Sequence, residues 1–527
     1  MRKKSVLIGG GLGYCYKRWM SSSSSEGRKR SAAVWGNGDY GRLGYGNLDS
    51  MWRPKLMNSS SFHNSNLKSI SCGGAHTLFL TETGRVYATG LNDFGQLGIS
   101  NNTTYCMEPL EVSGLKKEIV QISAGYHHSC AITVDGELYM WGKNSNGQLG
   151  LGKKAENVVP VPTKVECLSG INIKMVALAS EHSIAVTDGG QALSWGGGGS
   201  GRLGHGHQSS LLGFFRSSSE YTPRHIKKLD GVKVKNIAAG LLHSACIDEN
   251  GSVYIFGEKA VDKLAFGDAN NTTTPSMIGK LPYSQEVACG GYHTCVITSN
   301  FLRCINISVI LSHYVIGDGN MKRLRNRDVL KKKHPNNRKL SSRGQVEGLG
   351  RDTNGQKEMV NEWNVPGCFK GMLMARNNNF IKDMEDKGGH FIRKLDFVMM
   401  EFLAFVGSGE LYTWGSNENG CLGNGSIDVL HIPERVEGPF LRSPVEKVSC
   451  GWKHTAAISE GNVFTWGWGG SHGTFSEDGL SSGGQLGHGD DFDYGNPTLV
   501  AFEKKMKALE VSCGFNHTGA ILESVDA

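Results

Sequence analysis

Histidine and cysteine recur in this sequence at fixed spacings, and both residue types can act as metal ligands or catalytic groups. Six copies of the motif Gly-x-x-His recur at regular intervals, and a seventh copy has alanine in place of glycine. Its histidines are His76, His128, His182, His243, His293, His454 and His517. In four copies a cysteine directly precedes the glycine: Cys72, Cys289, Cys450 and Cys513. Cysteine and histidine four residues apart could bind zinc if their side chains met.

The regular recurrence of these pairs argues against metal chemistry. One pair per repeat places the pairs in separate structural units, and none of the 13 cysteines belongs to a Cys-x-x-Cys pair, which is typical of structural zinc sites. We therefore predict no metal site. The cysteines are expected to be small buried thiols. The histidines are expected to hydrogen-bond the backbone within each unit, because buried polar groups need partners.

The dinucleotide-binding fingerprint Gly-x-Gly-x-x-Gly is matched at Gly36-Gly38-Gly41 and at Gly196-Gly198-Gly201. Both belong to the repeat itself, and neither opens a helix inside a strand-helix-strand unit, as the fingerprint requires. The sequence also has no phosphate-binding loop, no His-Glu-x-x-His motif and no nucleophile elbow with partners. We predict that the chain is not an enzyme. No catalytic, cofactor-binding or metal-binding residue is assigned, and no cofactor is expected.

Three motifs recur in register and define a repeat of about 52 to 54 residues. A Trp-Gly pair or a variant of it occurs seven times, and in five copies its glycine follows the histidine of Gly-x-x-His, or of its alanine variant, by 13 or 14 residues. Gly-x-Leu-Gly comes after six of the seven pairs. Between histidine and tryptophan lie two alternating apolar runs around a turn such as Asp135-Gly136, the pattern of a β-hairpin. Glycine accounts for 73 of the 527 residues, as many tight turns require.

Each repeat is long enough for four short antiparallel strands, and seven such units favour an all-β, seven-bladed β-propeller. The last repeat stops ten residues after His517, before any Trp-Gly strand. The segment Ala32-Ala33-Val34-Trp35-Gly36 carries that strand near the other end of the chain. We predict that it completes the final blade beside residues 511–523 and so closes the ring.

Charge divides the chain into distinct parts. Residues 1–33 are basic and serine-rich with a net charge of +7, which is typical of a mitochondrial transit peptide; a disordered tail or a nuclear signal is the alternative. Residues 300–407 carry +8, so the remaining 34–299 and 408–527 carry −8. No stretch approaches the roughly 20 apolar residues of a membrane-spanning helix, and no membrane span is expected.

Residues 300–407 interrupt the fifth repeat. Removing them joins Ser299 to Ser408 and restores the 14-residue interval from His293 to Gly415. The block has no Trp-Gly, no hairpin pattern and several basic runs. We interpret it as a disordered loop at a hairpin tip or as an intron translated in frame. A basic RNA-binding arm is the alternative.

The segments WGNGDYGRLGYG, MWGKNSNGQLGLG and SCGWKHTAAISEGNVFTWG resemble the regulator of chromosome condensation repeats, a family of seven-bladed propellers. The resemblance covers 34–299 and 408–527. With its transit-like start, the chain is most similar to the plant mitochondrial branch of the family. That similarity implies a role in mitochondrial intron splicing and hence in respiratory complex I biogenesis.

The family also contains small-GTPase exchange factors and an ultraviolet-B photoreceptor. The photoreceptor senses light through tryptophans on Gly-Trp-x-His-Thr segments. Only Trp452 stands at that position here, so photoreception is not expected.

These observations predict a non-enzymatic, monomeric propeller scaffold in mitochondria that binds protein or ribonucleoprotein partners such as an RNA-splicing complex. The alternative is a guanine-nucleotide exchange factor for a small GTPase, with the nucleus or cytoplasm as the alternative location. Because the ring is acidic, contact with RNA is expected to be indirect. The irregular loops 207–221 and 471–484 are the candidate partner contacts.

Overall fold

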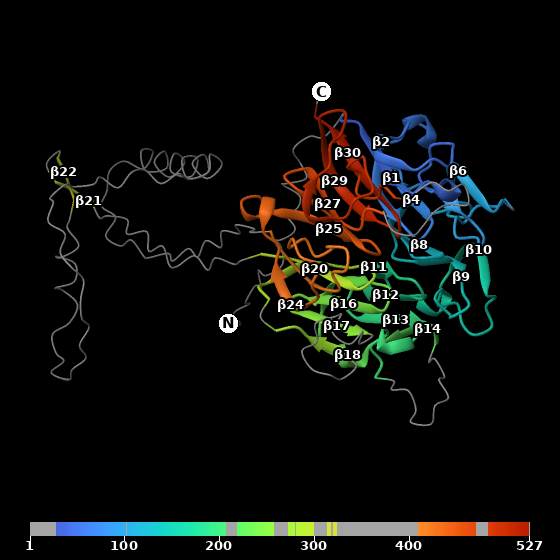
Figure 1. Cartoon of the computed structure of the whole chain (residues 1–527). Coiled ribbons are helices and arrows are strands. Elements are labelled where there is room, and N and C mark those ends of the chain that lie inside the picture. The colour runs from blue at the N-terminus through green and yellow to red at the C-terminus, as the bar shows by residue number, and fades with distance from the viewer. Residues whose placement is uncertain are drawn as a thin grey trace, which may run out of the picture. The chain divides into compact units, whose positions relative to one another are not determined.

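The computed structural model describes residues 28–101, 103–206, 219–257, 272–279, 281–299, 314–317, 320–323, 409–470 and 483–525. Seven four-stranded antiparallel sheets in this part of the chain surround a central channel as the blades of a propeller (Figure 1). The predicted all-β, seven-bladed propeller is confirmed. Among the described residues, no helix has the length and apolar character needed to cross a membrane.

In every blade the first strand borders the channel and the fourth lies at the rim. Blades 1 to 4 are, in that order, β3 (Leu67–Cys72), β4 (His76–Thr81), β5 (Val86–Leu91) and β6 (Tyr105–Glu111); β7 (Ile119–Ala124), β8 (His128–Thr133), β9 (Leu138–Lys143) and β10 (Val158–Lys164); β11 (Ile173–Leu178), β12 (His182–Thr187), β13 (Ala192–Gly196) and β14 (Glu220–His225); and β15 (Val234–Ala239), β16 (His243–Asp248), β17 (Val253–Gly257) and β18 (Thr272–Met277).

Blades 5 to 7 use strands that are not all consecutive in the sequence. They are β19 (Ser284–Cys289), β20 (His293–Thr298), β23 (Glu410–Gly415) and β24 (Leu430–Arg435); β25 (Val445–Cys450), β26 (His454–Ser459), β27 (Asn462–Gly467) and β28 (Tyr494–Leu499); and β29 (Met506–Cys513), β30 (His517–Ser524), β1 (Arg30–Gly36) and β2 (Met51–Leu56). Short 3-10 helices lie in the connections, at Asp39–Gly41, Ser59–Phe62, Glu166–Leu168, Gly199–Gly201, Lys227–Leu229 and Gly438–Leu441.

Blade 7 contains strands from both ends of the described chain. β1 pairs with β30 along its whole length, from Arg30 opposite Glu523 to Gly36 opposite His517. The predicted closure of the ring by this strand is therefore confirmed. The strand begins earlier than the expected ring boundary at residue 34, because Arg30 also forms an ion pair with Glu523 at 3.2 Å. Residues 30–33 thus belong to the ring, and residues 1–27 of the predicted transit peptide lie outside the described part.

The hairpin of blade 5 forms although residues 300–408 separate its two strands in the sequence. β20 pairs with β23 from His293 opposite Gly415 to Thr298 opposite Glu410. Gly409 follows the break with a φ of +49°, and its carbonyl accepts a hydrogen bond from the Val445 amide at 2.9 Å. Hairpin glycines of other blades make the same contact with the next blade. The ring therefore has its usual geometry at this point.

The chain divides into two compact units, the ring unit (Met1–Phe301 with Phe405–Ala527) and a second unit, Leu302–Ala404. In the second unit the structure describes a hairpin of β21 (Tyr314–Gly317) and β22 (Asn320–Arg323). The prediction that the block 300–407 lacks any hairpin pattern was wrong here. An Asp-Gly pair joins the two strands in the sequence, and this turn signal was overlooked. The other residues of the block lie outside the described part.

The hydrophobic core is divided among the gaps between adjacent blades. Leu78 and Leu80 of blade 1, for example, pack with Ile122 and Trp141 of blade 2. Five tryptophans of the Trp-Gly motif are fully buried: Trp35, Trp141, Trp195, Trp414 and Trp466. Each blade therefore needs both neighbours to bury its apolar faces, as expected for a repeat fold.

Candidate interaction face at the channel mouth

The seven histidines of the Gly-x-x-His motif form a closed ring of hydrogen bonds between blades. Each histidine begins the second strand of its blade, and its Nε2 bonds the hydroxyl that directly follows the histidine of the next blade. The pairs are His76–Ser129, His128–Ser183, His182–Ser244, His243–Thr294, His293–Thr455, His454–Thr518 and His517–Thr77. Six nitrogen–oxygen distances are 2.7–2.9 Å, and that of His128 is 3.4 Å.

The same hydroxyls determine which nitrogen of each imidazole carries the proton. Thr455 Oγ1, for example, donates its proton to the carbonyl oxygen of Cys421 at 2.9 Å. A hydroxyl has only one proton, so Thr455 must accept from His293, and Nε2 carries the hydrogen. Equivalent donations from Thr77, Ser129, Ser183, Ser244 and Thr518 fix the tautomer at five further blades.

The carbonyl that accepts these protons belongs to the variable residue of Gly-x-Leu-Gly in the preceding blade. At the joint of blades 2 and 3, Gln148 O accepts from Ser183 Oγ at 2.8 Å and from Trp195 Nε1 at 2.9 Å. Gln96 and Cys421 each accept the same two bonds at their own joints. One carbonyl thus connects all three sequence motifs.

Burial keeps the ring histidines neutral. Each is at most 1% exposed. Burial lowers the pKa of His76, His128, His293 and His454 to about 3 and that of His243 to about 4. It also holds the pKa of His182 and His517 well below the usual value. The ring therefore carries no charge at neutral pH, and its histidines fasten one blade to the next.

The expectation that these histidines bond the backbone of their own blade was wrong. The backbone within the blade is already paired, since Gly73 N donates to His76 O at 2.8 Å. The imidazole instead reaches the next blade. Its position also explains the motif's glycine, because a Cβ on Gly73 would lie 2.5 Å from His76 Cε1 and 2.5 Å from the carbonyl oxygen of Gly125.

Six rings form a continuous row beside the channel mouth, which we call the aromatic row. Tyr126, Trp452 and Phe515 directly follow the first residue of their Gly-x-x-His motifs and line the channel. All members except Trp468 are partly exposed. Neighbouring centroids are separated by 4.9 Å (Phe94–His127), 4.5 Å (His127–Tyr126), 5.2 Å (Tyr126–Phe515), 4.3 Å (Phe515–Trp452) and 5.6 Å (Trp452–Trp468).

A glycine in blade 1 makes the aromatic row continuous. Blade 1 lies between blades 2 and 7, and Gly74 occupies the position that Tyr126 and Phe515 occupy in those blades. A Cβ on Gly74 would lie 2.4 Å from Tyr126 O and 2.9 Å from its Cδ2, so only glycine lets Tyr126 reach Phe515. Lys143 lies 5.0 Å above the ring of Phe94, and Lys453 lies 4.9 Å above Trp452. A cation–π contact therefore stands near each end of the row.

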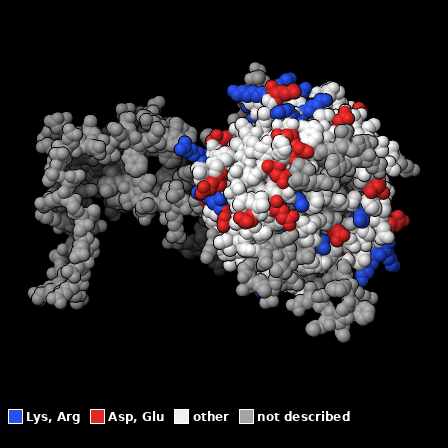
Figure 2. Space-filling view, viewed as in Figure 1, with Lys and Arg blue, Asp and Glu red and all other residues white. Residues whose placement is uncertain are grey.

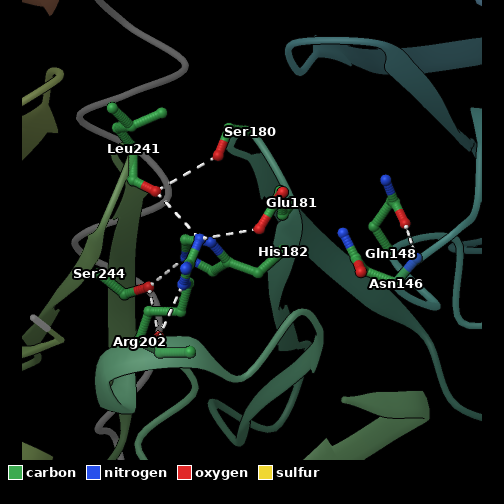
Figure 3. Close-up of polar contacts among 9 residues, drawn as sticks. Asn146, Gln148, Ser180, Glu181, His182, Arg202, Leu241 and Ser244 are labelled. Carbon is green, nitrogen blue, oxygen red and sulfur yellow. Dashed lines mark hydrogen bonds and ion pairs between the residues drawn. The ribbon is translucent and has the colours of Figure 1, made fainter. Parts of the chain in front are cut away.

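Blades 3 and 4 present a polar network around the same mouth (Figure 3). Arg202 Nε donates to the carbonyl oxygen of Gly199 at 2.9 Å, and its Nη1 lies 3.3 Å from Leu241 O and 3.5 Å from Glu181 Oε2. Ser180 Oγ also donates to Leu241 O, at 3.3 Å. Arg202 is buried, whereas the Glu181 side chain is 46% exposed. This side of the mouth therefore offers a carboxylate opposite the aromatic row.

Charge is unevenly distributed on the face seen in Figure 2. Acidic side chains gather over the C-terminal blades, and basic ones lie mainly around the periphery of this face. This agrees with the net charge of −8 for 34–299 and 408–527. An acidic surface repels the phosphate backbone of RNA.

The partner contacts proposed from the sequence lie largely outside the described residues, since 207–218 and 471–482 are not described. The aromatic row was not predicted from the sequence, because its members come from blades 1, 2, 6 and 7. A signal existed: the position after the motif's first residue is aromatic in Tyr126, Trp452 and Phe515. Trp452 is also not isolated, because Trp468 packs against it.

Family comparisons agree with this architecture. The RCC1-like domain matches residues 31–305, and the regulator of chromosome condensation (RCC1) repeat matches 408–458 and 479–521. The chain belongs to the RCC1 repeat family. Propellers of this family are mostly regulatory or binding modules.

Two relatives illustrate the range of the RCC1 family. The ultraviolet-B receptor UVR8 of Arabidopsis thaliana is 27% identical over 471 residues, which cover 88% of this chain and 76% of that protein. The E3 ubiquitin-protein ligase HERC2 of Homo sapiens is 31% identical over 296 residues, which cover 55% of this chain. The match spans only 6% of HERC2, so the similarity concerns a propeller segment of that ligase.

Solved structures share the propeller fold. Human WBSCR16 has a TM-score of 0.63 at 19% identity, covering 94% of this chain and 100% of that one. Prp20p from Saccharomyces cerevisiae, described with its binding to Gsp1p and histones, has a TM-score of 0.63 at 18% identity, covering 94% and 92%. At such identities the likeness concerns the fold.

Proposed function

We propose that this chain is a non-enzymatic mitochondrial scaffold that assists intron splicing of mitochondrial transcripts and hence respiratory complex I biogenesis. The aromatic row carries the binding part of the proposal. Partly exposed Tyr126, Phe515 and Trp452 form a contiguous apolar surface at one mouth of the channel. Aromatic side chains that present large area at low entropic cost are typical anchors of protein interfaces. The partner at this surface is a protein of the splicing complex.

The charge distribution supports contact with RNA through that protein. The ring segments carry −8, and the positive charge is concentrated in 1–33 and 300–407. The basic, serine-rich start supports mitochondrial import. A fluorescent fusion of the full chain should therefore enter mitochondria, and its exclusion from them would contradict the proposed location.

Affinity capture from mitochondria tests the binding surface. The wild-type chain should co-purify splicing proteins and intron-containing RNA, and the double variant Trp452→Ala/Phe515→Ala should lose most of both. Phe492→Ala is the matched control, because Phe492 is 66% exposed and takes no part in the aromatic row. Equal recovery with both variants would exclude the aromatic row as the docking surface.

A guanine-nucleotide exchange factor is the second candidate. The observation that favours it is the shared fold with Prp20p, which was described with its binding to Gsp1p. The purified chain should then accelerate release of a fluorescent guanine nucleotide from a small GTPase of its own compartment. A release rate equal to that of the GTPase alone would count against exchange activity on that GTPase.

A further inference from the structure

Two cysteines meet a ring histidine at the joint between blades 5 and 6. His293 and Cys295 lie two residues apart on β20, so their side chains point to the same side of the strand. That side faces blade 6, because His293 bonds Thr455 there. Cys450 ends the channel strand of blade 6. The ligand atoms of His293, Cys295 and Cys450 all lie within 4.8 Å of one another.

Comparison of the seven joints shows that the fold itself does not require two thiols at this place. The two positions are the second residue after a ring histidine and the residue before the Gly-x-x-His motif, or its Ala179 variant, in the next blade. All seven pairs lie in the described part of the ring, and the other six contain at most one cysteine. They are Leu78 with Ala124, Cys130 with Leu178, Ile184 with Ala239, Ala245 with Cys289, Ala456 with Cys513, and Gly519 with Cys72.

The imidazole at this joint has the tautomer that a metal ligand requires. Nε2 of His293 donates to Thr455, which leaves the lone pair of Nδ1 for a ligand. In the six other ring histidines, which face at most one thiol, Nδ1 has no hydrogen-bond partner: His76, His128, His182, His243, His454 and His517. The His293 and Cys295 side chains are at most 1% exposed, so water competes little for this position.

Two thiols and an imidazole suit zinc. Zinc prefers sulfur and nitrogen ligands at about 2.0–2.3 Å in a tetrahedron, which places the ligand atoms roughly 3.5–4 Å apart. The 4.8 Å bound on this cluster requires the ligand atoms to approach one another by at most about 1.3 Å. Two thiolates balance the charge of Zn²⁺, which matters because an unbalanced buried charge is costly. Cys450 borders the channel, from which a water molecule can reach a fourth position.

We propose that His293, Cys295 and Cys450 bind one zinc ion, with water from the channel as the fourth ligand. Two thiol protons are released to solvent as the two zinc–sulfur bonds form. β20 is the last ring strand before the block 300–407, and β25 opens the first blade that lies wholly after it. The ion therefore ties the two parts of the ring together across that block. Because this clamp is independent of any partner at the aromatic row, it goes beyond the proposed function.

Cobalt titration of the metal-free full chain tests the proposal, with Co²⁺ as the probe. The wild-type chain should develop thiolate-to-cobalt absorption that saturates at about one Co²⁺ per chain, and Zn²⁺ should displace it. Cys450→Ser should lose this absorption or bind at least about tenfold more weakly. Cys513→Ser is the matched control, because Cys513 has the same place in blade 7 but faces Ala456. It should bind as the wild type does.

Melting curves separate loss of metal binding from loss of folding. Zinc should raise the melting temperature of the wild type and of Cys513→Ser but not that of Cys450→Ser or Cys295→Ala. The proposal is overturned if wild-type cobalt absorption is absent, or if Cys450→Ser retains it in full. A Cys295–Cys450 disulfide, seen as a loss of two hydrogen masses in a wild-type chain that takes up no metal, would also overturn it.

Discussion

A single hydroxyl beside each ring histidine joins two blades, and its chemistry can be tested one atom at a time. Thr518 is fully buried, accepts from His454 at 2.9 Å and donates to Gln485 O at 2.8 Å. Removing this hydroxyl from blade 7 leaves a donor, His454 Nε2, and an acceptor, Gln485 O, without partners on blade 6. Both would remain buried, which is the costly case for a lost hydrogen bond.

We expect Thr518→Val to lower the free energy of unfolding by about 1–3 kcal/mol. Valine keeps the shape of threonine, so little of this loss comes from packing. Thr518→Ser keeps the hydroxyl and should lose clearly less. Urea denaturation followed by tryptophan fluorescence measures both variants. If Thr518→Ser and Thr518→Val lower the free energy of unfolding equally, the hydroxyl does not stabilise the contact between blades 6 and 7.

The neutral histidines also predict how stability depends on pH. In the unfolded chain each histidine takes up a proton near pH 6.5. In the fold, burial holds the pKa of the ring histidines down, to about 3 for His76 and about 4 for His243. The unfolded state therefore binds more protons between about pH 6.5 and 3, so stability is full above pH 6.5 and is lost as the pH falls through this window.

One buried carboxyl opposes this trend. Burial raises the pKa of Glu510 to about 7. Its folded state therefore binds a proton that the unfolded state lacks between about pH 7 and 4.5, and its contribution is lost as the pH rises through 7. The one extra proton that Glu510 binds in the folded state is outnumbered by the protons that the seven histidines take up on unfolding. The urea midpoint should fall clearly between pH 7 and 5, with several protons taken up on unfolding. A flat midpoint over this range would show that the ring histidines are already protonated in the fold or remain neutral after unfolding.

At the scale of the structural element, the Gly-x-Leu-Gly loop of one blade docks against the tryptophan of the next. Gly98 has a φ of +68°, and a Cβ there would lie 2.8 Å from Trp141 Nε1. Gly150, Gly423 and Gly487 stand in the same relation to Trp195, Trp466 and Trp35. The final glycine of the motif is thus required both by the positive φ of its own turn and by the close approach of the tryptophan in the neighbouring blade.

The variants Gly98→Ala and Gly114→Ala separate the cost of the positive φ from the cost of the contact with the neighbouring tryptophan. Gly114 also has a positive φ, +79°, but a Cβ there would meet nothing within 4 Å. Gly114→Ala should therefore cost only the left-handed backbone, about 1–2 kcal/mol. Gly98→Ala should cost a further 1–3 kcal/mol, roughly, because the tryptophan must shift. If urea denaturation shows equal losses of unfolding free energy for the two variants, the loop can move to accommodate a Cβ at position 98 without cost.

The sequence predicted elements well where the signal is local. Each hairpin has alternating apolar residues around a turn, and Asp135-Gly136 can be recognised without any distant residue. The histidine bonds could not be predicted in this way, because His293 and Thr455 are 162 residues apart and belong to different blades. The aromatic row also depends on blade order, since Gly74 matters only once blades 2 and 7 flank it. Contacts between residues of different repeats depend on which blades become neighbours in the closed ring, and no local sequence pattern shows this.

At the scale of the whole molecule, β1 holds the ring closed. Ala33 and Trp35 on this strand are fully buried between blades 6 and 7. Deleting residues 1–36 should lower the melting temperature by more than about 10 °C, because several large buried contacts are lost at once. Deleting 1–27 leaves β1 whole and should change it little. Circular dichroism on heating measures both deletions, and identical curves would mean that the ring does not need its closing strand.

The ring should also tolerate loss of the block that interrupts blade 5. Thr298 pairs opposite Glu410, and the hairpin glycine Gly409 makes the usual contact with Val445. Deleting 300–407 should therefore move the melting temperature by less than about 5 °C. The remaining acidic ring, without 1–27, should bind RNA weakly and with strong salt dependence. Tight binding at physiological salt in a filter assay would contradict this.

Ring closure also sets an order of events during synthesis. Arg30 and Glu523 pair in the finished protein although 493 positions separate them. The ribosome therefore releases β1 and β2 before the other strands of the ring. Until β30 is synthesised, these two strands can pair only with each other, and such an isolated hairpin is marginally stable in water. The edge of β1 stays open to unwanted strand pairing until β30 emerges. A circular permutant that begins at residue 57 would carry β1 and β2 directly after β30. It should reach the native state faster and with less aggregation than the natural chain.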